Sequence, residues 1–132
     1  MRYALLLAAG ATLTGCANHD PRPETDAPYT VEWIGKRPLV GHSHITLTLD
    51  DQGRAYGNAG CNHWFASYRL DGEQLSFAEP GSTRRACAPA VMEQEQRFLA
   101  ALASVQRWEI TEQGQLRLFS ANERVLRLKP ED

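Results

Sequence analysis

The chain has 132 residues, a formal net charge of −2 at pH 7, 42% hydrophobic residues and 23% charged residues. This length supports a single domain with a modest core, and the composition is that of a globular protein that folds in water. The mild acidity argues against nucleic acid or anionic lipid headgroups as the main partner, because both require a clustered basic surface.

The first 15 residues have the layout of a secretory signal peptide. Arg2 gives a charged start, residues 3–12 are uncharged, and small residues precede Cys16. The apolar stretch is well short of the roughly 20 residues that span a bilayer core. A cysteine at the cleavage position resembles a bacterial lipoprotein signal, which implies cleavage before Cys16 and acylation of Cys16 with fatty acids such as palmitate. A plain secretory signal with a chance cysteine is the alternative.

Residues 16–28 contain three prolines and several charges without apolar periodicity. We therefore expect a disordered tether behind the lipidated Cys16, with a reach of at most roughly 40 Å. Ala17 follows the cysteine, and resemblance to lipoproteins sorted by this position implies the outer membrane, with the domain in the periplasm.

Cys61 and Cys87 are the cysteines that remain once Cys16 carries lipid. Export would place both in an oxidising compartment, so we expect a single disulfide. A bridge of this span would stabilise the domain by roughly 3–4 kcal/mol. The competing role for Cys61, as a nucleophile activated by His63, is disfavoured because Cys87 competes for the thiol.

Residues 29–130 are expected to form the folded domain. Short alternating or β-branched and aromatic stretches between turn residues predict strands at 29–34, 44–50, 54–58, 67–70, 74–77, 108–111, 116–119 and 125–129. The strands at 44–50 and 54–58 are expected to form one hairpin, and those at 67–70 and 74–77 are expected to form a second.

Residues 89–103 change to helical spacing, and Pro89 suits the first turn of a helix. The apolar positions are Val91, Met92, Phe98, Leu99 and Leu102, and those expected on the opposite side are Glu93, Gln94, Gln96 and Arg97. The predicted fold class is a β-rich α+β fold. It is a small antiparallel, partly closed β-barrel-like sheet of about seven or eight strands with one inserted amphipathic helix.

Two cysteine-bearing motifs indicate a family. Residues 57–62 read Gly-Asn-Ala-Gly-Cys-Asn, and residues 82–87 read Ser-Thr-Arg-Arg-Ala-Cys directly before the helix. Together with Glu95–Leu99 and Leu116–Leu118, they resemble the META domain of HslJ-like heat-shock lipoproteins, from Tyr29 onward. The resemblance implies that Cys61 pairs with Cys87, that the fold is of the small-barrel kind, and that the protein belongs to the envelope and is linked to stress. It implies no shared catalytic activity.

The motif residues also have a structural interpretation without the family. Gly57 and Gly60 permit positive φ angles or close backbone approach, and Asn62 tolerates a left-handed conformation while bonding to nearby backbone. Ser82 or Thr83 is expected to bind backbone in the opposite half of the loop.

Four residues beside the cysteines form a candidate contact surface. Trp64 and Phe65 are adjacent and cannot both face one core, so one of them is a candidate for exposure, unless Trp64 caps the mouth of the barrel. Arg84 and Arg85 in the facing half-loop are candidates for binding carboxylates or phosphates, or are simply solvated.

His42 and His44 flank Ser43 at the start of an expected strand. Two histidines alone do not make a zinc site, which needs three or four protein ligands. We therefore predict no metal site and no cofactor.

The leading hypothesis is a non-enzymatic, monomeric envelope lipoprotein that binds or supports an unidentified envelope protein during stress. One alternative is a carrier of a small apolar ligand or acyl chain, or a chaperone similar to a secretion pilot, which requires an internal cavity. It is disfavoured if Phe98, Leu99 and Leu102 fill the interior. Another alternative is a lysozyme inhibitor, for which Arg84 and Arg85 are the local candidates.

Overall fold

The computed structural model describes residues 8–13, 15 and 20–132. Cys16 and Ala17, on which the predictions of lipidation and sorting depend, lie outside these residues. Within the described part, no helix is long and apolar enough to cross a membrane.

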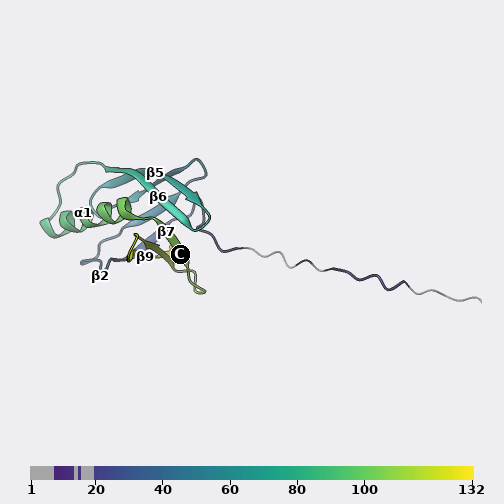
Figure 1. Cartoon of the computed structure of the whole chain (residues 1–132). Coiled ribbons are helices and arrows are strands. Elements are labelled where there is room, and N and C mark those ends of the chain that lie inside the picture. Colours follow the sequence, from purple (N-terminus) through teal and green to yellow (C-terminus); the bar gives the residue numbers. More distant parts are fainter. Residues whose placement is uncertain (1–7, 14, 16–19) are drawn as a thin grey trace, which may run out of the picture.

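The domain is one sheet of nine strands that closes on itself, with a single long helix on one side (Figure 1). The strand order is β2-β1-β3-β4-β5-β6-β7-β8-β9, and β1 also pairs with β9. All strand pairings between named strands are antiparallel. The elements are β1 (Tyr29–Ile34), β2 (Arg37–Pro38), β3 (Thr46–Leu49), β4 (Arg54–Asn58), β5 (His63–Asp71), β6 (Gln74–Ser82), α1 (Pro89–Ser104), β7 (Arg107–Ile110), β8 (Leu116–Phe119) and β9 (Arg124–Pro130).

The arrangement is ring-like and is not a true barrel. Strands β6 and β7 meet through a single register pair, Gln74 with Arg107. Helix α1 connects these two strands in the chain and packs against β6, β9 and β1, so it links β6 to strands on the other side of this short contact. The predicted fold class is thereby confirmed, and the additional strand is the two-residue β2.

The core fills the interior of the ring. Trp64 makes edge-to-face contacts with Phe77 and with Phe98 of α1, at centroid distances of 6.3 and 5.6 Å. Phe98 and Leu102 are both 0% exposed. These two helix residues thus occupy the space that an internal ligand would need.

Five strands, β3, β5, β6, β7 and β9, have bounds that differ from the expected ones. Strand β3 begins at Thr46, so His44 precedes it. Strand β5 begins at His63 and includes Trp64 and Phe65, with a register shift between Phe65 and Ser67. The extra residue of this β-bulge lies on β6, where Glu79 has a φ of +51°, and β5 itself keeps the alternating burial of a strand.

The domain also begins earlier than predicted, because the expectation of disorder up to Pro28 is wrong for its last six residues. Pro23 is buried, and Thr25 forms a parallel bridge with Leu49. The Asp26 amide donates to the Leu49 carbonyl at 2.7 Å. Strand β1 starts opposite Leu47, so the end of β3 beyond this residue has no partner in β1. The segment before β1 supplies the donor that the backbone acceptor there requires.

Candidate functional site

A disulfide joins the two motifs that the sequence singles out. Cys61 and Cys87 are bonded with an S–S distance of 2.01 Å and a Cα–Cα distance of 6.1 Å. The predicted pairing is therefore confirmed. It ties the turn before β5 to residues 83–88, the loop between β6 and α1, which we call the disulfide loop.

Asn62 fixes the backbone of the disulfide loop from inside. Its side chain is 2% exposed, and its Oδ1 accepts from the Thr83 hydroxyl at 3.1 Å and the Arg85 amide at 2.6 Å. Its Nδ2 donates to the Arg85 carbonyl at 3.2 Å and to Glu95 Oε2 at 2.8 Å. Because both polar atoms of the side-chain amide are bonded, the loop is held in one conformation.

Glu95 of α1, which is not among the predicted site residues, completes this network. Its side chain is 1% exposed, and Oε1 accepts from the Asn62 backbone amide at 2.7 Å. A signal was present, because Glu95 lies four residues after Val91 and three before Phe98 and so shares their helix face. A carboxylate on a core-facing stripe indicates an internal hydrogen-bond partner.

Gln94 is also buried, and the expectation that it faces solvent is wrong. It is 0% exposed, and its Oε1 accepts from the Val40 amide at 2.7 Å. The helix packs against β6, β9 and β1, so neighbours cover it on more than one side and the buried stripe is wider than amphipathicity suggests.

The two motif glycines meet different backbone demands. A Cβ at Gly57 would lie 2.1 Å from the Thr46 carbonyl oxygen, so only glycine permits this approach of β4 to β3. Gly60 has a φ of +113°, in the region that disfavours other residues.

The adjacent aromatic residues point in opposite directions. Trp64 is 1% exposed and its Nε1 donates to the Thr46 carbonyl at 2.8 Å, whereas Phe65 is 54% exposed. Of the two aromatic side chains, Phe65 is therefore the one exposed on the surface.

Arg84 and Arg85 are exposed on the disulfide loop. They line a surface groove of about 520 Å³ together with Met92, Glu95, Gln96 and Leu99 of α1, and the carboxylate of Glu95 is buried there with both oxygens bonded to Asn62. Among the ion pairs of the described residues, neither arginine takes part. The groove therefore combines free cationic groups with apolar side chains on a fixed backbone.

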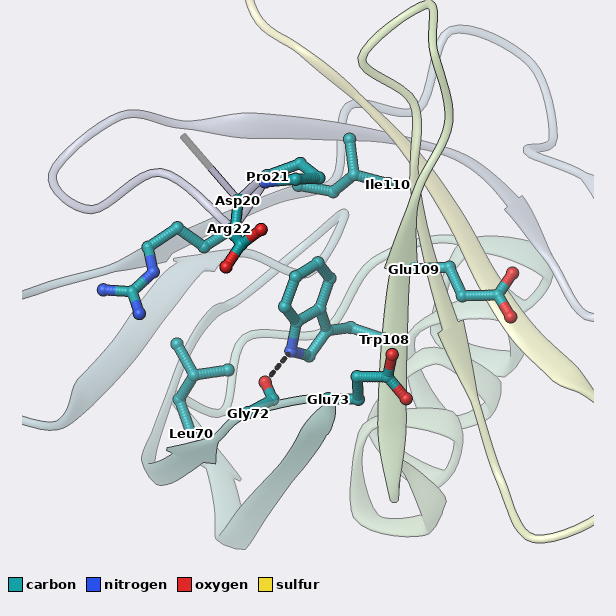
Figure 2. A pocket seen from close by; sticks show the side chains of 9 residues that line it. All are labelled: Asp20, Pro21, Arg22, Leu70, Gly72, Glu73, Trp108, Glu109 and Ile110. Atoms are coloured by element: carbon teal, nitrogen blue, oxygen red, sulfur yellow. Dashed lines mark hydrogen bonds between the residues drawn. The ribbon is translucent and has the colours of Figure 1, made fainter. Parts of the chain in front are cut away.

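A second surface pocket, of about 620 Å³, lies near the N-terminal segment (Figure 2). Leu70, Trp108 and Ile110 line it together with residues 20–22, and the indole of Trp108 donates to the Gly72 carbonyl at 2.8 Å. The chain thus enters the domain beside the turn between β5 and β6.

His42 and His44 lie in the segment before β3. His44 Nε2 is 3.1 Å from Glu131 Oε1, and His42 is exposed. Across residues 8–13, 15 and 20–132, no group of three or more His, Cys, Asp or Glu side chains is placed to hold a metal ion.

Comparison with known proteins identifies the family. A family model described as the META domain matches residues 23–132, which begins at the buried Pro23. The chain belongs to the META domain family. No curated protein gives a significant match to this META-domain chain.

Two solved structures have the same fold. An NMR structure of a protein from Burkholderia xenovorans is 29% identical, with a TM-score of 0.67, and the match covers 81% of this chain and 83% of that one. A second NMR structure is 20% identical with a TM-score of 0.61, covering 78% and 87%.

Proposed function

We propose that this META-domain protein is a non-enzymatic, lipid-anchored binding module of the bacterial envelope, with its domain in the periplasm and a role during stress. The observation that carries the proposal is the Cys61–Cys87 disulfide, because such bonds persist in oxidising compartments. The signal-like first 15 residues and Cys16 agree with export and lipid attachment.

The site supports a binding role through rigid display of a loop. The disulfide and the bonds from Asn62 hold the backbone around Arg85, while the arginine side chains stay exposed. A loop ordered before binding loses less conformational entropy on contact with a partner. Such a device suits recognition of another envelope component.

The core favours this role over carriage of an apolar ligand inside the ring. Phe98 and Leu102 are fully buried among the strands, where an acyl chain would have to lie. Displacing them would remove large parts of the core, at a cost of several kcal/mol each.

Labelling cells with radioactive palmitate tests the anchor. We expect label on the wild-type protein and on the control C61S/C87S, and none on C16S, which should also leave the membrane fraction or stay unprocessed. Equal labelling of C16S and wild type, or no label on either, would refute lipid attachment at Cys16.

Substitution of Ala17 tests the membrane to which the protein is sorted. We expect wild type and the control A17S in the outer membrane, and A17D retained in the inner membrane. Density-gradient separation of the two membranes gives the answer, and recovery of wild type in the inner membrane would contradict the sorting proposal.

A further inference from the structure

We infer that the lipid anchor holds the acidic end of the domain toward the membrane, and that the groove beside Arg84 and Arg85 binds an acidic protein segment in the periplasm. This inference rests on the proposed function and adds the orientation, the surface and the chemistry of the partner.

The strand topology defines two ends of the ring. Strands β3, β5, β7 and β9 all run toward one end, where the turns at 50–53, 71–73 and 111–115 and the C-terminus lie. We call it the tether end, because Thr25 bridges to Leu49 there. The disulfide loop lies at the opposite end, the loop end, and Figure 1 shows the N-terminal segment leaving the domain on the side away from this loop.

The turns at the tether end are acidic. Their carboxylates, with that of Asp132 at the C-terminus, are Asp50, Asp51, Asp71, Glu73 and Glu112, whereas the carboxylate of Glu131 lies 3.1 Å from His44 Nε2. Burial raises the pKa of the Tyr68 phenol at this end, and the nearby carboxylates of Asp50, Asp26 and Asp51 raise it further. Arg54 at this end is occupied by Asp50, at 3.5 Å.

The loop end has the opposite character. Its connecting segments carry Lys36, Arg84 and Arg85, with Arg37 and Arg124 at the adjoining strand starts, and one carboxylate, Glu123. The connecting segments at the two ends therefore carry charges of opposite sign, although the net charge of the chain is small.

The segment between Cys16 and the domain is short. Pro23 is buried and residues 20–22 already line a pocket of the domain, so residues 17–22 span at most roughly 20 Å. A tether of this length keeps the tether end nearest the lipid. Anionic headgroups repel the carboxylates at this end, so they do not draw the side of the domain onto the membrane surface. The loop end then points away from the membrane.

The groove at the loop end has the chemistry to bind a carboxylate next to an apolar side chain. Arginine binds carboxylates in bidentate geometry, and Met92 and Leu99 supply adaptable apolar contacts. Its charge complements an acidic segment. A second copy is not the expected occupant, because its own acidic end is held at the lipid surface.

Orientation can be measured on the lipidated full-length protein in bicelles that contain a gadolinium-chelating lipid headgroup. We expect stronger NMR line broadening for the amides of Gly53, Gly72 and Gly114 than for those of Thr83 and Cys87. Broadening of the Thr83 and Cys87 amides that equals or exceeds that at the three glycines would overturn the orientation.

Partner chemistry can be measured by titrating the same sample with a short synthetic peptide that alternates glutamate and leucine. We expect R84E/R85E to weaken binding by about tenfold or more, as for a cationic hot spot, and high salt to weaken binding to wild type. The control R22E/K129E makes the same change in net charge at or near the tether end and should change the affinity little.

Three outcomes would overturn the assignment of the groove. These are equal losses in the two double variants, salt-dependent binding of the loop end to anionic bicelles in place of the peptide, and dimerisation that R84E/R85E abolishes. If palmitate labelling shows that Cys16 is not acylated, the anchor and the orientation fail. The peptide titration of the unlipidated full chain still tests the groove.

Discussion

At the scale of single residues, the pair Asn62 and Glu95 decides how the disulfide loop is held. Burial of a carboxylate is costly unless donors replace the lost water. Here one oxygen accepts from the Asn62 backbone amide and the other from the Asn62 side chain, at 2.7 and 2.8 Å. Asn62 thus provides a hydrogen-bond donor to each carboxylate oxygen of Glu95, and its side chain also binds the backbone of Arg85.

Glu95→Gln tests this account with almost no change in shape. The new NH₂ group would face a donor where an oxygen now accepts, so one hydrogen bond is lost and a buried donor is left without a partner. We expect a loss of about 1–3 kcal/mol in the free energy of unfolding, measured in urea.

Glu93→Gln is the matched control, because Glu93 is exposed on the same helix. It should change stability by less than about 0.5 kcal/mol. Equal stability of the E95Q protein and the wild type would show that the carboxylate is not required for the network.

At the scale of the elements, the contact between β3 and β4 depends on Gly57. The Thr46 carbonyl lies against its Cα and also accepts the indole N–H of Trp64. The strand pairing and the position of the central tryptophan are therefore coupled through one backbone group.

Gly57→Ala is expected to destabilise the domain by about 3 kcal/mol, because a Cβ would force the two strands apart in a packed region. Gly72→Ala is the comparison, since Gly72 has a φ of +57° but open space around it. Backbone strain alone costs about 1 kcal/mol there. Thermal unfolding of both variants measures the difference, and a larger loss in G72A would contradict the steric account.

At the scale of the whole molecule, closure depends on contacts between distant parts of the chain. β1 pairs with β9, and α1 packs against β6, β9 and β1, whereas β6 and β7 meet through one register pair. The Cys61–Cys87 bridge spans 26 residues and anchors the segment that leads into this helix.

Removal of the disulfide in C61A/C87A is expected to lower the free energy of unfolding by about 3 kcal/mol, because the unfolded chain gains freedom. Reductant should lower the stability of the wild type by a similar amount and leave the variant unchanged. A variant as stable as the oxidised wild type would show that Asn62 and the core hold the loop without the bridge.

Local patterns in the sequence determined most of the elements. Strands β1, β4 and β8 have the predicted bounds, and α1 extends one residue beyond its predicted end. Side-chain periodicity, turn residues and Pro89 depend on neighbours in the chain, which is why a sequence alone reveals them. The disulfide followed from the cysteine count and the export-like start.

The tertiary structure alone decided which surfaces meet. Burial of Gln94 and Glu95, docking of Pro23, exposure of Phe65 in place of Trp64, and closure of β1 on β9 all depend on partners far away in the chain. A helical or alternating pattern predicts that one face of an element will be buried, but it does not show which other element will pack against that face. Packing between distant parts of the chain therefore determined the conformation of the disulfide loop and the positions of the charged turns at the two ends of the domain.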